Sequence, residues 1–371
     1  MSAAAHHPLR DWHVDRPHRM HRLGDLTLRS GERLRDTFVS YVTHGELAPA
    51  RDNAIAVLSA IGSTHHRLDF LIGPRKALDT ERWFIVAIDA LGNGLSISPS
   101  NSAAQPGASF PRLSIADMVE SQRRLLAEVF GVQRLAAVVG ASMGGMQALQ
   151  WAVAHPDAMQ RIVAMTPLAK TPPWTRLVNR VAREALGHAH HDDDTAHRLA
   201  ADPLSGYLPR DHTDAIATAS AADHGDAAAA WRRWALVFRA LLNRSPAALE
   251  READVDACVA RLETDSVEQR LAPLDWIAQS FAYDAHDVGQ ARGFGGDTAK
   301  ALSSVRARTL VLAPPLDLYN PAEHARWIAS VIPGARFVEI PSVQGHQAAN
   351  AVDAADVAFV NAQIAAFLSG P

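Results

Sequence analysis

Short apolar runs rich in Val, Ile and Ala recur along this chain, with helical segments between them. Four of these runs read WFIVAI at 83–88, LAAVVG at 135–140, RIVAMT at 161–166 and RTLVLA at 308–313. Each is long enough for a strand and short for a helix. Strands that are apolar throughout are buried on both faces, which is typical of a parallel sheet covered by helices. The alternation therefore predicts an α/β fold.

Further runs complete a mostly parallel eight-stranded sheet flanked by helices. The additional strands are expected at 25–34 and 36–44, as an antiparallel opening pair, and at 54–60 and 336–340. Helical spacing of apolar residues predicts helices at 114–130, 143–155, 322–331 and 352–368.

The segment 169–298 interrupts this rhythm. It is rich in Ala, Asp, His and Arg, reads as helix and offers no buried strand. We expect a helical cap inserted between two sheet strands, with the core at 24–168 and 299–371 and an N-terminal extension at 1–23. A cap over the carboxyl edge of the strands would close a pocket and shape its substrate.

Composition excludes several classes of function. The net charge is −4 and the 36 Lys and Arg residues are scattered, so nucleic-acid binding is not expected. No stretch approaches 18 apolar residues, and the N-terminus lacks the apolar core of a signal peptide, so we expect a cytoplasmic protein without a membrane partner. The single cysteine, Cys258, rules out an intramolecular disulfide and a cysteine metal cluster.

The sequence suggests neither a cofactor nor a metal. Phosphate-binding glycine motifs are absent, and so is a helical ligand spacing such as H-E-x-x-H. The histidine-rich stretch GHAHHDDD at 187–194 lies in the charge-rich part of the expected cap, where we interpret it as a solvated loop.

Residues 138–147 read VVGASMGGMQ and join an apolar strand to a helix. This is the context of a nucleophile elbow, in which a serine takes a strained backbone conformation and small neighbours let strand and helix approach. Ser142 would then expose its hydroxyl, and the N–H of Met143 at the helix start would face a developing oxyanion. The alternative is a glycine-rich turn whose serine only caps the helix.

A serine needs a base and an orienting acid, which follow it in the chain order serine, acid, histidine in this fold. Asp317 in APPLDLYNP and His346 in PSVQGHQAAN each follow a predicted strand, at the sheet edge where α/β proteins place their sites. A helix-capping aspartate and an ordinary loop histidine are the alternatives. The sequence therefore predicts a Ser142–His346–Asp317 catalytic triad.

Several segments together resemble the homoserine O-acetyltransferase family of α/β-hydrolase-fold enzymes. They are GASMGGMQALQWAVAHPD, FPRLSIADMVESQRRLLAEVFGV, LIGPRKALDTERWFIVAIDALGNG, NRVAREAL and FAYDAHDV, with the contexts of Asp317 and His346, and the resemblance extends over residues 24–369. In that family the serine takes an acetyl group from acetyl-CoA and passes it to an amino-acid hydroxyl. The resemblance implies that Arg183 holds the acceptor carboxylate, and that a homodimer forms through the cap.

The chain departs from the family pattern at three places. It reads LSAIGS where the family has an H-A-L-T-G stretch, so the second oxyanion donor is the N–H of Ala60 or Ile61. It reads GNGLSISPSN at 92–101, a version that resembles ester-hydrolysing relatives. Gln347 replaces the acid that the family's G-H-D motif presents to the amino group of homoserine, and a charge-assisted contact of this kind is worth about 1.5–3 kcal/mol.

These departures favour water over homoserine as the acyl acceptor. We therefore expect a serine hydrolase that cleaves small, acetyl-type carboxylic esters through an acyl-enzyme, with Arg183 and Gln347 near the substrate. The alternative is an O-acetyltransferase that moves acetyl from acetyl-CoA to homoserine or a related hydroxyl.

Overall fold

The apolar runs form the centre of one eight-stranded sheet in the computed structural model, which describes residues 9–187, 224–268 and 271–370. The strands are β1 (Arg19–Thr27), β2 (Arg33–His44), β3 (Ala54–Leu58), β4 (Phe84–Ile88), β5 (Ala137–Ala141), β6 (Arg161–Met165), β7 (Arg308–Ala313) and β8 (Arg336–Glu339). Their order is β1-β2-β4-β3-β5-β6-β7-β8. The strands from β3 to β8 pair in parallel, whereas β2 runs antiparallel to both β1 and β4. The predicted fold class is confirmed.

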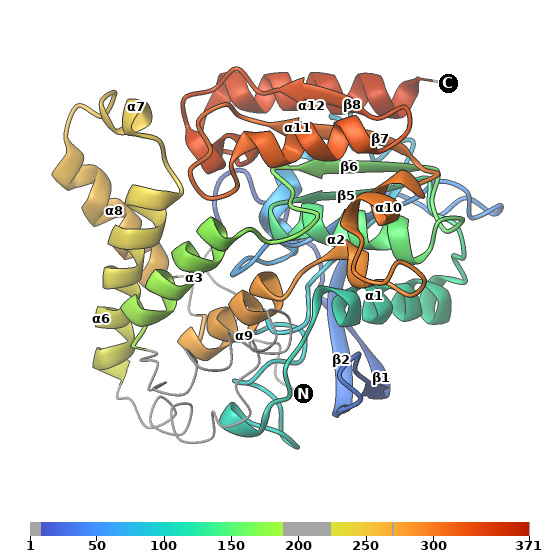
Figure 1. Ribbon diagram of the computed structural model, residues 1–371, viewed down its shortest axis with the longest axis horizontal. Coiled ribbons are helices and arrows are strands. Elements are labelled where there is room, and N and C mark those ends of the chain that lie inside the picture. The colour runs from blue at the N-terminus through green and yellow to red at the C-terminus, as the bar shows by residue number, and fades with distance from the viewer. Residues whose placement is uncertain (1–8, 188–223, 269–270, 371) are drawn as a thin grey trace.

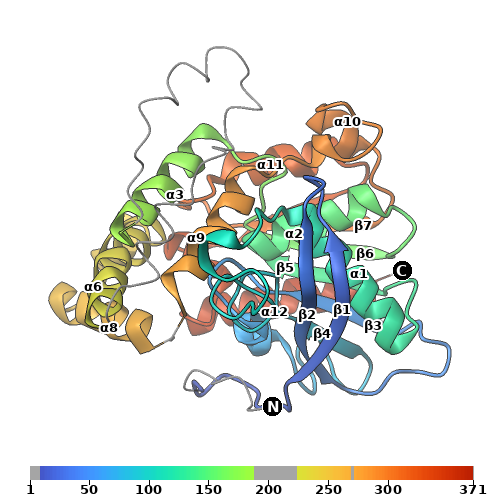
Figure 2. The same ribbon diagram turned by 90° about the horizontal axis from the view of Figure 1, so that it is seen from below.

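The first strand differs from the prediction of 25–34. β1 begins at Arg19, and Thr27 pairs with Arg33 across a turn that contains Gly31 at φ 90°. The Ser30-Gly31 pair is a turn signal that favours chain reversal over a continuous strand. The start of β1 consequently lies inside the expected N-terminal extension, at the edge of the sheet (Figure 2).

Helices cover both faces of the sheet, as the buried strands require. One face carries α1 (Ile115–Phe130), α2 (Met143–Ala154), α10 (Thr298–Ser303) and α11 (Ala322–Val331). The opposite face carries the 3₁₀ segment η1 (His65–Leu71) and α12 (Ala354–Ser369). The remaining 3₁₀ segments are η2 (Gly107–Ser109), η4 (Val288–Gln290) and η5 (Gly345–Ala349).

Between β6 and β7, the described residues contain helices and connecting turns but no strand. Besides η4 and α10, the helices here are α3 (Pro173–Ala185), α6 (His224–Trp234), the π-helical segment η3 (Ala235–Leu242), α7 (Pro246–Leu249), α8 (Val255–Glu268) and α9 (Pro273–Asp284). Figures 1 and 2 show α3, α6, α8 and α9 gathered on one side of the sheet. This arrangement fits the predicted cap at 169–298, whose boundaries stay our prediction. Nearly all of the histidine-rich stretch 187–194 lies outside the described residues.

Aromatic side chains hold the cap helices together. Trp231, Trp234 and Phe238 are each at most 6% exposed, and the rings of Trp234 and Phe238 both contact Trp276 of α9. The helical spacing of these residues therefore reflects packing. Among the described residues, no helix has the length and apolar character needed to cross a membrane.

Candidate active site

Ser142 sits in a sharp turn between β5 and α2. Its backbone has φ 55° and ψ −122°, and its N–H donates to the Met165 carbonyl over 2.9 Å. A Cβ on Gly140 would lie 2.2 Å from the backbone of Gly144, and a Cβ on Gly144 would lie 2.4 Å from the Leu58 carbonyl oxygen. Only glycine fits these two positions, so the glycine flanks predicted from the sequence are a steric requirement of the turn.

Three residues from separate loops meet at this turn. The Nε2 atom of His346 lies 2.9 Å from the Ser142 hydroxyl, and its Nδ1 atom lies 2.7 Å from Oδ2 of Asp317. All three are buried, with exposed fractions of 2–4%. The geometry is that of a base placed between a nucleophile and an orienting carboxylate.

Asp317 is fixed by its own turn. Its Oδ1 atom accepts from the N–H groups of Tyr319 and Asn320 over 2.9 and 2.8 Å, which leaves Oδ2 directed at His346. The following helix α11 begins only at Ala322, so Asp317 does not cap it. The two backbone donors and the imidazole account for the orientation of this buried carboxylate.

The loop after β3 presents one available N–H near Ser142. The N–H of Ala60 donates to Ser63 Oγ over 2.8 Å, and that of Gly62 donates to Gln279 Oε1 over 2.9 Å. Within the described part of the chain, the Ile61 N–H has no protein acceptor, and Ile61 lines the same cavity as Ser142. Ile61 is thus the better of the two predicted second donors, together with Met143 at the first position of α2.

Residues that the sequence did not single out hold this loop. Gln147 donates from Nε2 to the Ser59 carbonyl over 2.9 Å, and Gln279 donates from Nε2 to the Leu91 carbonyl over 3.1 Å. Gly62 packs so closely on Trp276 that an added Cβ would lie 2.6 Å from its ring. No sequence signal links Gln279 to a loop 217 positions earlier.

Ser142 and His346 open into a cavity of about 370 Å³ between the sheet edge and the cap. Trp234, Phe238 and Tyr319 give it an apolar wall, and residues 9, 10, 12 and 13 close another side. The start of the chain therefore contributes to the site, where we had expected only an extension. The rest of the cavity wall carries polar and charged side chains as well, and a cavity of this size suits a small ester.

Three arginines, Arg10, Arg67 and Arg239, line the cavity together with Asp265 and Glu268. Burial lowers the pKa of Arg67 to about 10, with the charge of Arg239 acting in the same direction, and burial also lowers the pKa of Arg239 to about 10. Both therefore stay protonated at neutral pH. Arg239 contacts Ser266 and Asp265 of α8.

Arg183 is placed apart from this cavity. Its guanidinium donates to Asp284 Oδ2 over 2.8 Å and to Ser280 Oγ over 3.0 Å, and it lies over the ring of Phe281. Arg183 is 4% exposed and does not line the cavity that contains Ser142. Burial raises the pKa of Asp284 while Arg183 opposes that shift.

Gln347 does line the cavity, next to His346. Its Oε1 atom accepts from Asn350 Nδ2 over 2.5 Å. The structure thus brings Ser142, Asp317, His346, Ile61 and Gln347 to one place.

Comparison with known proteins agrees with this fold. Residues 72–344 match the alpha/beta hydrolase fold family. A probable esterase of Corynebacterium glutamicum is 30% identical over 340 residues, covering 90% of each chain. A homoserine O-acetyltransferase of Leifsonia xyli subsp. xyli is 31% identical, covering 86% of this chain and 82% of its own.

A solved structure is similar to this chain over nearly its whole length. The crystal structure of an acetylester hydrolase from Corynebacterium glutamicum superimposes with a TM-score of 0.83 at 27% identity, covering 95% of this chain and 96% of that one. With the parallel sheet, the serine turn and these matches in agreement, the chain belongs to the alpha/beta hydrolase fold family.

Proposed function

We propose that this enzyme hydrolyses small, acetyl-type carboxylic esters through an acyl-enzyme on Ser142. The observation that carries the proposal is the hydrogen-bonded chain from Ser142 through His346 to Asp317, at the wall of a small cavity. The esterase and acetylester hydrolase among the similar proteins support this choice of substrate class.

In the first half of the reaction, Ser142 Oγ attacks the acyl carbonyl carbon while His346 Nε2 takes the hydroxyl proton. The N–H groups of Met143 and Ile61 stabilise the oxyanion of the tetrahedral intermediate. As the intermediate collapses, the ester C–O bond breaks and the imidazolium returns its proton to the leaving alcohol. Asp317 holds the imidazole tautomer and stabilises the imidazolium throughout.

In the second half of the reaction, water hydrolyses the acyl-enzyme, again with His346 as base and then as acid. His346 deprotonates the water as its oxygen attacks the acetyl carbonyl, and the same proton then goes to Ser142 Oγ when the acyl–enzyme bond breaks. The products are acetate and the free enzyme, which is ready for another ester molecule.

The alternative acceptor is the hydroxyl of homoserine, with acetyl-CoA as the donor, as the acetyltransferase relative indicates. Two contacts favour water instead. Arg183 is already paired with Asp284, so a substrate carboxylate would have to displace that partner. Gln347 offers a neutral amide where an ammonium group would need a carboxylate.

The test is a direct comparison of the two reactions. We would measure release of p-nitrophenol from p-nitrophenyl acetate, propionate and butyrate, and CoA release from acetyl-CoA with and without homoserine. We expect ester hydrolysis that declines with acyl length, and CoA release that homoserine does not accelerate. A large acceleration by homoserine would make the enzyme an acetyltransferase.

We further propose that the enzyme is a homodimer that pairs through the cap. Trp174, Leu177 and Val181 on α3 are 46%, 54% and 41% exposed and lie at helical spacing, so they form one apolar stripe. A stripe of this kind on a cap helix is suited to packing against its copy across a two-fold axis.

A further inference from the structure

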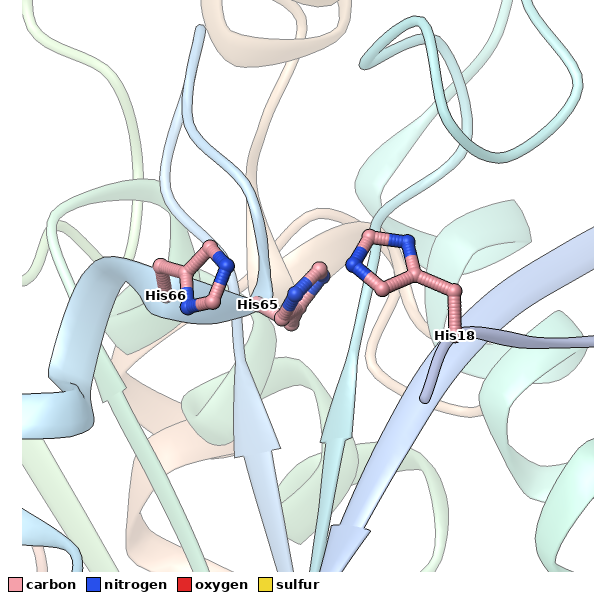
Figure 3. Close-up of side chains that lie close together, drawn as sticks. All are labelled: His18, His65 and His66. Carbon is pink, nitrogen blue, oxygen red and sulfur yellow. The ribbon is translucent and has the colours of Figure 1, made fainter. Parts of the chain in front are cut away.

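Three histidines from two distant parts of the chain meet beside the active-site loop. His65 and His66 open η1, and His18 immediately precedes β1. One ring nitrogen from each histidine can be chosen so that the three atoms lie within 4.8 Å of one another. Figure 3 shows the three rings in a row, with His65 between His66 and His18.

Two buried carboxylates orient these rings. Nδ1 of His65 lies 2.9 Å from Asp89 Oδ2, and Nδ1 of His66 lies 2.5 Å from Asp69 Oδ2. A carboxylate on one imidazole nitrogen fixes the ring and increases the basicity of the other nitrogen, which is the arrangement found behind metal-bound histidines. Because a carboxylate holds Nδ1 of both rings, Nε2 is the atom with which each ring would bind a metal ion.

Two buried carboxylates and a further buried histidine without hydrogen bonds in the described residues lie close to the three rings. Asp69 and Asp89 are at most 1% exposed, and buried carboxylates are destabilising unless cations balance them. His44 is 2% exposed and has electrostatic contact with Asp69, His65 and His66. Neither of its ring nitrogens has a hydrogen-bond partner within the described residues, an arrangement that a buried polar group rarely adopts.

We propose that His18, His65 and His66 bind one divalent transition-metal ion, with Zn²⁺ the best match. Imidazole ligands select Zn²⁺, Co²⁺, Ni²⁺ or Cu²⁺ over Mg²⁺ and Ca²⁺, which prefer oxygen. Tetrahedral Zn²⁺ holds nitrogens at about 2.0–2.1 Å, hence about 3.4 Å apart, so the rings close in by roughly 1 Å on binding. Water supplies the fourth ligand.

The position of the site indicates a structural role. His18 belongs to the start of the chain, whereas His65 directly follows the loop that carries Ile61. His66 lines the active-site cavity, and His13 stacks on it with ring centroids 4.4 Å apart. A metal ion would therefore fasten the N-terminal segment to the loop after β3 that carries Ile61, the proposed oxyanion loop, while the triad performs the chemistry without it.

The experiment uses the full chain with five other histidines replaced by glutamine. These are His6, His7, His188, His190 and His191, which could bind metal adventitiously. After chelator treatment, CoCl₂ and ZnCl₂ are titrated separately by calorimetry, and the visible spectrum of the Co²⁺ protein is recorded. We expect one metal ion per chain, tetrahedral Co²⁺ bands, and a melting temperature about 3–6 °C higher at Zn²⁺ 100-fold above Kd.

Matched variants locate the ion. His18→Gln removes a half-buried ligand and should lower affinity at least about 100-fold, whereas His21→Gln, further along β1 and paired with Glu128, should leave it unchanged. Circular dichroism shows whether each variant is folded. Absence of binding to the five-glutamine protein, or equal affinity in the two variants, would overturn the proposal, and the cluster would then be a hydrogen-bonded core feature.

Discussion

The backbone of Ser142 holds a conformation that a residue with a side chain rarely adopts, and such strain persists only where neighbours impose it. The Met165 carbonyl and the close approach of Gly144 to Leu58 provide that constraint. The Oγ atom that results from this turn is aimed at His346.

Replacing Ser142 by alanine should abolish ester turnover and leave the fold intact, because the change removes only one oxygen atom. We expect a loss of at least about 10³-fold in kcat with p-nitrophenyl acetate. Ser121→Ala, which removes an equally buried hydroxyl from α1, should keep full activity. A Ser142→Ala variant that retains more than about a hundredth of wild-type turnover would point to another nucleophile.

Gln347 tests the choice of acceptor. Gln347→Asp should raise acetyl transfer from acetyl-CoA to homoserine by up to about 100-fold, the worth of one charge-assisted contact, while ester hydrolysis changes less. Both rates would be measured side by side. The control is Gln344→Asp, which adds the same charge outside the cavity lining. An equal gain in acetyl transfer in both variants would show that position 347 has no specific role.

For single residues, the sequence predicts positions that follow from the order of strands along the chain. It does not predict which distant side chain a residue will contact. The meeting of Ser142, Asp317 and His346 was predictable because each follows a strand of a parallel sheet, and their catalytic roles stay our prediction. The choice between Ala60 and Ile61 depends on a Ser63 hydroxyl that accepts from the Ala60 N–H. The pairing of Arg183 with Asp284, 101 positions away, likewise has no local signature.

At the scale of elements, α9 of the cap is attached to the loops of the core at two points. Gln279 accepts from the Gly62 N–H and donates to the Leu91 carbonyl. Asp275 accepts from both the N–H and the hydroxyl of Ser100.

Gln279→Ala should release the oxyanion loop. Because the Ile61 N–H, as the proposed oxyanion donor, would act mainly on the transition state, we expect kcat to fall about 10-fold or more while KM changes little. Gln363→Ala on the surface of α12 is the matched control. A change confined to KM would show that Gln279 serves substrate binding instead.

Asp275 should make stability depend on pH. Burial raises its pKa from 3.8 to about 7, so the folded state holds the proton more tightly than the unfolded chain. Its stabilising contribution is therefore complete below about pH 4 and is lost as the pH rises through 7, by up to about 4 kcal/mol. Asn at this position keeps an acceptor for the Ser100 N–H and stays neutral.

Urea unfolding of wild type and Asp275→Asn between pH 4 and 8 checks this expectation. The variant should gain stability relative to wild type as the pH rises, and the two should be similar at pH 4. A constant difference across the range would mean that Asp275 is ionised in the folded state throughout.

The elements themselves were largely predictable, because buried parallel strands read as apolar runs. The first strand was misplaced because Ser30-Gly31 turns the chain within an apparently continuous segment. The attachment of α9 was not predictable, since Gln279 and Asp275 resemble ordinary polar positions of a helix.

For the whole molecule, the proposed dimer depends on the exposed stripe of α3. Leu177→Glu should convert the dimer to a monomer by placing a charge in the interface, whereas Met20→Glu, at a similarly exposed apolar position on β1, should not. Light scattering gives the mass of each protein. A wild-type monomer, or a dimer that survives Leu177→Glu, would exclude the stripe as the interface.

The shape of the cavity arises only in the assembled molecule. Its walls come from the core loops, the cap and residues 9, 10, 12 and 13 at the start of the chain, which are far apart in sequence. For this reason the sequence supports the reaction class better than the acyl length.

The most direct test of the proposed function is to trap the intermediate. Wild type would be mixed with p-nitrophenyl acetate, quenched during the first turnover and digested for peptide mass spectrometry. We predict a burst of one p-nitrophenol per chain and one acetyl group on the peptide that contains Ser142, lost again in water without an added acceptor. An acetyl group on another residue, or an acetyl-Ser142 that persists until homoserine is supplied, would contradict a serine ester hydrolase.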